Sequence, residues 1–327
     1  MTPAVRRRPA DLPDLVARAR AGEALAVARL ISLVEDASPA LPAVAALLAP
    51  HTGRAQILGV TGSPGVGKST STSALVSAYR AAGARVGVLA VDPSSPFSGG
   101  ALLGDRVRMQ DHATDAGVFI RSMASRGHLG GLAWATPQAL RVLDAAGCDV
   151  VIVETVGVGQ AEVEIASLAD TTLLLLAPGM GDGIQAAKAG VIEIADIFVV
   201  NKADRDGADQ TVRDLRAMLS LGGRHSEAGA WRPEIVRTIA SQGSGIDDVV
   251  AAVDKHTSWL AASGELSHRR TARAAAEIEA IAVATTRAQL RDGYAGEALQ
   301  RLAVEVAGGR TDPYSAAERL LIEALPQ

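Results

Sequence analysis

Residues 62–69 read Gly-Ser-Pro-Gly-Val-Gly-Lys-Ser and match the GxxxxGK[ST] pattern of a phosphate-binding loop. The loop joins a strand-like run at 56–61 to a helical stretch that begins at Lys68, so backbone N–H groups and the positive end of a helix dipole would converge on phosphate. Lys68 would reach the β- and γ-phosphates, and the Ser69 hydroxyl would bind Mg²⁺. The alternative is an ordinary glycine-rich turn between a strand and a helix. The predicted phosphate loop consists of Gly62, Ser63, Pro64, Gly65, Val66, Gly67, Lys68, Ser69 and Thr70.

Residues 201–204 read Asn-Lys-Ala-Asp and could select the base of the nucleotide. Asp204 would accept hydrogen bonds from the N1–H and the 2-amino group of guanine, neither of which adenine has. A hydrogen bond to a charged group contributes about 1.5–3 kcal/mol, so the loss of two would lower ATP affinity by about 10² or more. Lys202 would lie along the base plane, and Asn201 would brace the loop. A second base-contacting loop is predicted at Ser241, Gln242 and Gly243.

A carboxylate that could hold Mg²⁺ ends the apolar run 149–154. Residues 154–157 read Glu-Thr-Val-Gly at the place where GTP-binding proteins usually have DxxG. In that motif the carboxylate holds Mg²⁺ through water and the glycine N–H contacts the γ-phosphate. These roles are predicted for Glu154 and Gly157. The alternative is a strand-terminal carboxylate at the surface.

Two further acidic residues lie between the phosphate loop and this carboxylate. Asp92 follows a strand-like run, and Asp105 lies in the sequence GDRVRM beside Arg106 and Arg108. Either carboxylate could position Mg²⁺ or the attacking water, and an arginine could neutralise charge in the transition state. The alternative is a set of solvated charges in a loop. We predict Lys68, Asp92, Asp105 and Glu154 as catalytic residues, and Ser69, Asp92, Asp105 and Glu154 as metal-binding residues.

Only four of the 32 Lys and Arg residues are lysines, and two of these, Lys68 and Lys202, lie in nucleotide motifs. Lys188 lies instead in a glycine-rich segment, 177–190, that follows another strand-like run. The composition of this segment predicts a loop whose order depends on a partner or on the γ-phosphate. A plain connection between a strand and a helix is the alternative. The predicted switch residues are Asp182, Gln185 and Lys188.

The elements that would position these residues alternate along the chain. Strand-like runs alternate with helical stretches from residue 56 to about residue 260, and several runs are continuously apolar, which is typical of strands covered on both faces. This pattern predicts an α/β fold with a doubly wound, mainly parallel sheet and ligands at the carboxyl ends of its strands. The predicted strands are 56–61, 85–91, 117–121, 149–154, 171–177, 196–201 and 235–239.

Helical extensions are predicted on both sides of this sheet domain. Residues 11–49 have apolar residues at helical spacing, and Pro39 and Pro42 would break them into two helices. After Gly264 the pattern is helical again, in amphipathic pieces that could pack on the main domain or on a second subunit. The predicted domains are a helical extension at 1–52, a P-loop GTPase domain at 53–262 and a C-terminal helical arm at 263–327.

Composition and charge argue against several classes of protein. A net charge of −4 argues against a nucleic-acid-binding surface. No apolar run approaches the ~18 residues that indicate a membrane-spanning helix. The basic residues at 1–10 are not followed by a hydrophobic signal region, so a cytoplasmic location is predicted. Cys148, the one cysteine, cannot form an intramolecular disulfide and is predicted to be a small core residue.

Taken together, these motifs resemble those of the MeaB/ArgK family of P-loop GTPases. The resemblance covers essentially the whole chain and rests on GSPGVGKST, VDPSS, GDRVRM, ETVGVGQ and NKAD, in this order. It implies a Mg²⁺-dependent GTPase that binds GTP and GDP and is a chaperone of adenosylcobalamin-dependent methylmalonyl-CoA mutase, gating cofactor delivery and protecting the mutase from inactivation. It also implies a homodimer formed through C-terminal helices, and a third switch loop at 177–188. The cobalamin connection rests on the resemblance alone.

Other P-loop functions fit the sequence less well. A kinase linked to amino-acid transport would need a pocket and a base for a second substrate, which the sequence does not identify. Metal-insertion GTPases of nickel enzymes tend to carry His-rich tracts or Cys pairs, whereas this chain has six scattered His residues and one Cys. A protein-targeting GTPase would need a Met-rich domain, and five dispersed Met residues do not form one. The predicted Mg²⁺- and water-positioning residues disfavour an inert binding module.

Overall fold

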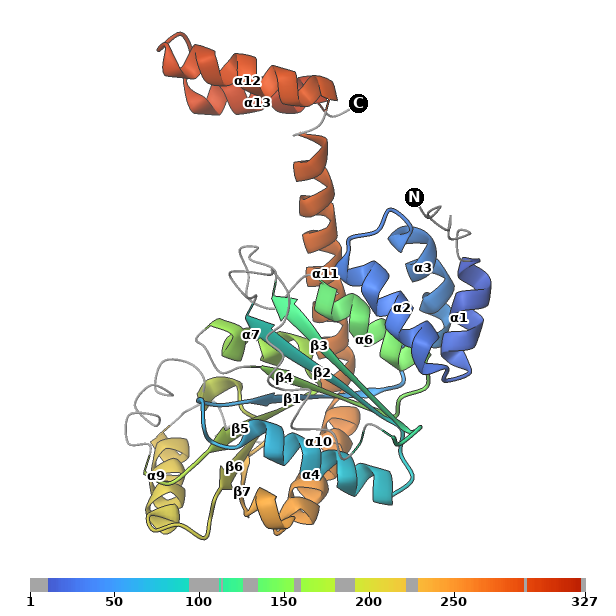
Figure 1. Ribbon diagram of the computed structural model, residues 1–327. Coiled ribbons are helices and arrows are strands. Elements are labelled where there is room, and N and C mark those ends of the chain that lie inside the picture. Colours follow the sequence, from blue (N-terminus) through green and yellow to red (C-terminus); the bar gives the residue numbers. More distant parts are fainter. Residues whose placement is uncertain are drawn as a thin grey trace, which may run out of the picture. The chain divides into compact units, whose positions relative to one another are not determined.

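The computed structural model describes residues 11–93, 112, 114–125, 135–155, 160–179, 192–221, 229–290 and 293–324. Its contacts divide the chain into two compact units, Met1–Arg270 and Thr271–Gln327. The first unit is built around one seven-stranded sheet (Figure 1). Every strand pair in the described part of this sheet is parallel, which confirms the predicted fold class.

The predicted strands are confirmed, with small shifts at their ends. They are β1 (Gln56–Thr61), β2 (Val86–Pro93), β3 (Val118–Ser125), β4 (Val150–Thr155), β5 (Thr171–Leu176), β6 (Ile197–Asn201) and β7 (Glu234–Thr238), and they lie in the order β3-β2-β4-β1-β5-β6-β7. All residues of β4 and β5 are buried, as their continuous apolar runs predict. Because neighbouring side chains of a strand point to opposite faces, Val150 and Ile152 join one core cluster while Val151 and Val153 join another.

Helices cover both faces of this sheet (Figure 1). Apolar side chains of α4 (Lys68–Ala81) and α10 (Ile246–Ser263) pack on one face. Those of α6 (Ala135–Ala145) and α7 (Gln160–Leu168) pack on the other. A smaller cluster lies between β6 and α9 (Ala208–Leu221). The sheet is therefore buried on both sides, and its strand ends are the edges at which polar residues can gather.

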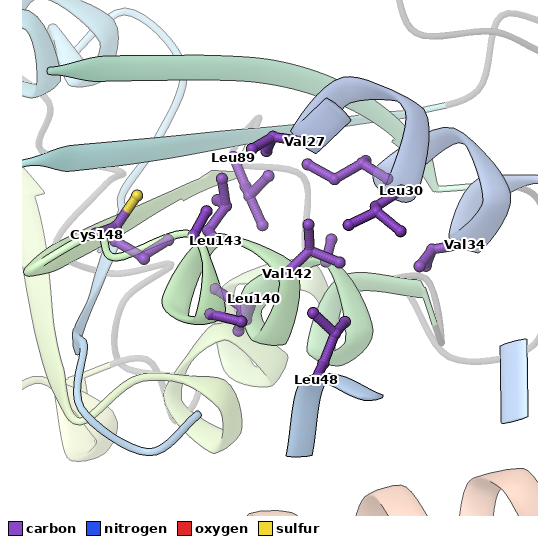
Figure 2. Packing of buried hydrophobic residues seen from close by; sticks show 14 of the residues in the cluster. Val27, Leu30, Val34, Leu48, Leu89, Leu140, Val142, Leu143 and Cys148 are labelled. Atoms are coloured by element: carbon purple, nitrogen blue, oxygen red, sulfur yellow. The ribbon is translucent and has the colours of Figure 1, made fainter. Parts of the chain in front are cut away.

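The N-terminal extension differs from the prediction of two helices. It forms three, α1 (Leu12–Arg20), α2 (Ala24–Glu35) and α3 (Leu41–Leu48), followed by a short 3-10 turn, η1 (Ala49–His51). The prediction missed the break at Gly22, whose φ of +83° ends α1 in a left-handed backbone turn. Figure 2 shows the resulting core, in which Leu30 and Val34 of α2 lie in one cluster with Val142 of α6.

Cys148 lies in the same cluster, as the sequence predicted (Figure 2). Its side chain is buried, and burial raises the pKa of the thiol to about 12. At neutral pH the thiol is therefore protonated and serves as a small apolar side chain.

Ion pairs tie the first turns of α11 (Glu265–Gln289) to the amino-terminal edge of the sheet. Arg270 donates from Nη2 to Asp170, which precedes β5, at 2.9 Å. Arg269 donates from both terminal nitrogens to Asp196, which precedes β6, at 3.0 Å. Both carboxylates are buried, so each interaction joins groups that water cannot easily solvate.

A buried histidine lies beside these ion pairs. His256 of α10 has no exposed surface, and its Nδ1 lies 2.8 Å from the hydroxyl of Thr171. Its ring packs against the rings of Trp231, with centroids 4.7 Å apart, and Trp259, with centroids 5.7 Å apart. Burial lowers the pKa of His256 to about 4, outweighing the opposite effect of the Asp196 carboxylate.

The second unit contains the rest of α11, α12 (Gly293–Ala307) and α13 (Pro313–Ala324). A small core joins α12 and α13 through Ala298, Leu302, Ala316 and Leu320. Several large apolar side chains of this unit are exposed, namely Ile278, Ile281, Val283, Leu299, Val304, Tyr314, Leu321 and Ile322. Among the helices that the structure describes, none is long and apolar enough to cross a membrane.

Candidate nucleotide-binding site

The phosphate loop connects the end of β1 to the start of α4, and two of its glycines lie where no side chain fits. Gly62 has a φ of +139°, and a Cβ atom there would lie 2.3 Å from the carbonyl oxygen of Leu175. Gly67 has a φ of +98°, and a Cβ atom there would lie 2.4 Å from Nδ2 of Asn201. Only glycine tolerates both the backbone angle and the close approach. The loop is therefore held directly against the ends of β5 and β6.

Lys68, the first residue of α4, is buried with its ammonium group inside the loop. Nζ donates hydrogen bonds to the carbonyl oxygens of Gly62, at 2.7 Å, and Ser63, at 3.1 Å. The positive end of the α4 dipole lies at the same place, so the loop combines two sources of positive potential. This arrangement suits an anionic ligand such as the phosphates of a nucleotide.

Ser69 and Glu154 meet at the adjoining ends of β1 and β4. The Ser69 hydroxyl donates a 2.7 Å hydrogen bond to Oε1 of Glu154, and the side chains are 7% and 4% exposed. The pairing of β1 with β4 places Val60 opposite Glu154, which brings the carboxylate to the phosphate loop. A hydroxyl and a carboxylate are hard oxygen ligands, and Mg²⁺ bound to a nucleotide needs few of them from the protein. The residues present therefore fit Mg²⁺.

Asp92 lies at the same edge of the sheet. In the pairing of β2 with β4, Val91 lies opposite Thr155, so the backbone of Asp92 is at the level where β4 ends. The other predicted residues of the hydrolytic site and of the switch lie outside the described residues. These are Asp105, Arg106, Arg108, Gly157, Asp182, Gln185 and Lys188.

Asn201, the last residue of β6, joins three loops. Its Nδ2 donates to the carbonyl oxygen of Val66 in the phosphate loop, at 2.9 Å. Its Oδ1 accepts from the hydroxyl of Thr238, at 3.1 Å, and from the backbone N–H of Ala240, at 3.0 Å. With 3% of its surface exposed, this residue uses its amide to satisfy polar groups of the phosphate loop and of the segment at the end of β7. It therefore fixes the two predicted base-binding loops relative to the phosphate loop.

The next residues place a lysine and an aspartate at the edge of the site. Lys202 has a φ of +57°, uncommon for a residue with a side chain, and its Nζ donates a 2.6 Å hydrogen bond to the carbonyl oxygen of Gly65. The N–H of Ala203 donates to the carbonyl oxygen of Thr238, at 3.0 Å. Asp204 is exposed, so its carboxylate is accessible to a base.

A groove of about 680 Å³ opens between α4 and the start of α10. The predicted second base loop, where Ala240–Gln242 forms the 3-10 turn η5, contributes Ser241 and Gly243 to one wall. Thr70, at the end of the phosphate loop, contributes to the other. The described residues that line it are Thr70, Ser73, Ala74, Ser77, Ala78, Ala240, Ser241, Gly243, Ile246 and Asp247.

Two parts of this site were missed by reasoning from the sequence. Thr238, which anchors both Asn201 and Ala203, gave no signal except that it ends a strand. The α4 wall of the groove did leave a pattern, because small side chains recur along this helix at the spacing of one helical face. They are Thr70, Ser73, Ala74, Ser77 and Ala78.

Comparison with known proteins agrees with this geometry. The family model of the methylmalonyl-CoA mutase-associated GTPase MeaB matches residues 27–293. A putative GTPase of Pyrococcus abyssi is 46% identical over 318 residues, which cover 96% of this chain and 97% of that protein. The GTPase ArgK of Escherichia coli is 39% identical over 269 residues, which cover 80% of each protein.

A solved structure is also similar over nearly the full length. The crystal structure of an LAO/AO transport system kinase superposes with a TM-score of 0.69 at 30% identity, covering 96% of this chain and 97% of that one. The family resemblance found in the sequence is thereby confirmed. With a phosphate loop, a Ser69–Glu154 pair and an Asn201-braced base loop at one sheet edge, this chain belongs to the MeaB family of GTPases.

Proposed function

We propose that this protein hydrolyses GTP with Mg²⁺ and uses that reaction to assist an adenosylcobalamin-dependent methylmalonyl-CoA mutase. The observation that carries the GTPase part is the set of hydrogen bonds made by Asn201, which link the phosphate loop to the loops after β6 and β7. A triphosphate on the first loop and a guanine on the other two would thus be bound by one connected unit. The mutase part is supported by the description of the matching family.

The residues of the site have distinct roles in this proposal. The loop N–H groups and Lys68 neutralise the phosphates, and Asp204 accepts hydrogen bonds from guanine. Ser69 and Glu154 hold Mg²⁺, which when bound stabilises the charge that develops on the phosphate oxygens. Asp92 and Asp105 position the metal or the attacking water, Gly157 contacts the γ-phosphate, and Arg106 or Arg108 offsets charge in the transition state.

The partner and the assembly are proposed on separate grounds. Asp182, Gln185 and Lys188 form a switch that responds to the mutase rather than a part of the basal site. We also propose a cytoplasmic location and a homodimer formed through the second unit. Exposed apolar residues such as Ile278, Val283 and Val304 support the homodimer, because an interface would remove large apolar side chains from water.

The test is the initial rate of phosphate release from GTP and from ATP, with and without saturating mutase. We expect slow release from GTP, much slower release from ATP, and stimulation by the mutase. Lys68→Ala should abolish the reaction, because the phosphates lose their main side-chain cation. Lys188→Ala should keep the basal rate and lose most of the stimulated rate.

The outcomes separate the parts of the proposal. Equal rates with ATP and GTP would show that the guanine assignment is wrong. GTP hydrolysis that the mutase does not stimulate would support the proposed GTPase activity and contradict the proposed role of the mutase as partner. Transfer of the γ-phosphate to a second substrate in place of release to water would instead favour a kinase, the activity named for the similar solved structure.

A further inference from the structure

The groove between α4 and α10 begins where the phosphate and base loops meet, and its contents bear on which sugar the site accepts. We propose that Asp247 binds the ribose hydroxyls of the nucleotide and makes the site selective for ribonucleotides over deoxyribonucleotides. This inference rests on the proposed binding of guanine nucleotides and adds a determinant of sugar specificity to it.

The two walls of the groove place it between the phosphate loop and the predicted base loop. Thr70 comes directly after Ser69, so this wall adjoins the phosphates, while Ser241 belongs to the predicted base loop. The N–H of Ala240 donates to Asn201, which also contacts the phosphate loop. The positions of the two walls are therefore fixed relative to each other. The sugar connects the α-phosphate to the base. A nucleotide that uses both loops therefore presents its ribose at this groove.

The chemistry of the lining suits a sugar. Ala74, Ala78 and Gly243 leave space, and Ser73 and Ser77 supply hydroxyl groups. Among the described residues that line the groove, Asp247 alone carries a charge. A carboxylate is acceptor-only and can receive hydrogen bonds from two neighbouring hydroxyls, which is how an acidic side chain binds the ribose in dinucleotide-binding folds.

The backbone that carries Asp247 is fixed. Gly245 has a φ of +76°, and a Cβ atom there would lie 2.1 Å from the carbonyl oxygen of Arg237, so this turn into α10 requires glycine. Ile246 follows and is buried in the core that α10 shares with α4. Asp247 is exposed in the first turn of α10, so its carboxylate can contact a ligand without loss of packing.

A competing explanation is that Asp247 only complements the positive end of the α10 dipole. Asp248 provides the matched control, because it occupies the same first turn and is also exposed but does not line the groove. A general effect of charge at the helix end would be similar for both residues. Contact with the sugar would be specific to Asp247.

The experiment measures dissociation constants of GDP, 2′-deoxy-GDP and 3′-deoxy-GDP by calorimetry for the full chain, Asp247→Ala and Asp248→Ala. We expect the parent to bind GDP about tenfold more tightly than at least one deoxy analogue, the value of one charge-assisted hydrogen bond. Asp247→Ala should lose this discrimination by weakening the binding of GDP more than that of the deoxy analogues, and Asp248→Ala should retain it.

Each other outcome has a definite meaning. Equal weakening of all three ligands in Asp247→Ala, tighter binding in that variant, or no discrimination by the parent would overturn the inference while leaving guanine nucleotide binding intact. Failure of the parent to bind any of the three would overturn the proposed function itself. Thermal unfolding of the nucleotide-free variants checks that the substitutions leave the fold unchanged.

Discussion

Asn201 determines much of the site through one amide group. Its nitrogen donates to the phosphate loop and its oxygen accepts from Thr238 and Ala240, so one buried side chain joins these loops. Asp204, three residues further along, is exposed, as its proposed contact with the base requires. In the proposed function, the structural role and base recognition thus belong to separate residues of one four-residue motif.

Asp204→Asn should weaken GTP binding by about 10²-fold, because two hydrogen bonds to a charged acceptor are lost. The same variant should favour XTP, since the 2-carbonyl of xanthine can accept from the new amide. Competition titration with GTP, ATP and XTP measures both effects. Asp206→Asn removes an exposed charge two residues away and should change neither affinity. If both variants lost GTP affinity alike, Asp204 would be acting through overall charge.

At the scale of elements, α11 begins as part of the sheet domain. Arg270 contacts the Asp170 carboxylate and also donates from Nη2 to the carbonyl oxygen of Ala55, at 3.0 Å. It thereby joins α11 to the segments that lead into β1 and β5. Asp170 also accepts from the backbone N–H of Ile57, at 3.1 Å. A single carboxylate thus connects the central strand, its neighbour and the helix.

Arg270→Ala should lower the free energy of unfolding by about 2–3 kcal/mol, because the buried Asp170 carboxylate loses its countercharge. Urea unfolding followed by tryptophan fluorescence measures this change. Arg287→Ala removes an exposed arginine from the same helix and should change the value by less than about 0.5 kcal/mol. If both variants lost a similar amount of unfolding free energy, the loss would come from a general effect on helix α11 and not from the Asp170 ion pair.

The elements differ in how far their sequence determines them. β4 and β5 were predictable because continuous apolar runs such as DVVIV fit few other positions in an α/β fold. The break at Gly22 was missed because the apolar spacing continues through it, and only the backbone angle ends the helix.

The parts of the candidate site also differ in how far the sequence predicts them. The phosphate and base loops are local motifs whose chemistry can be read along a few residues. The groove is formed by Thr70 and Asp247 from distant parts of the chain, and the Arg270–Asp170 pair joins residues 100 positions apart. Contacts of this kind depend on the final packing of the sheet, which no short sequence pattern encodes.

At the scale of the whole molecule, the buried His256 links stability to pH. Burial lowers its folded-state pKa to about 4, below the ordinary value of 6.5, so the unfolded chain binds a proton more readily than the folded one. The contribution of this group to stability is therefore complete above pH 6.5 and is lost as the pH falls toward 4.

Between pH 7 and pH 4, His256 should account for a loss of about 3 kcal/mol in the free energy of unfolding. His256→Gln is expected to be less stable at pH 7 because the ring packing is lost, but its stability should fall less steeply with acid. Unfolding curves at several pH values measure the slope. His268→Gln, in which the replaced side chain is 77% exposed, should retain the parental slope. An unchanged slope in His256→Gln would assign the acid sensitivity to carboxylates.

The central position of β1 has a consequence for how the chain is made. Both sheet neighbours of β1 come later in synthesis, since Gln56 pairs with Val150 and Leu58 with Thr171. A ribosome therefore releases β1 as an apolar strand with two open edges, and β4 must be made before the first edge can be covered and β5 before the second. A transcript truncated before β4 should yield an aggregating or degraded fragment, although it contains the entire phosphate-binding motif.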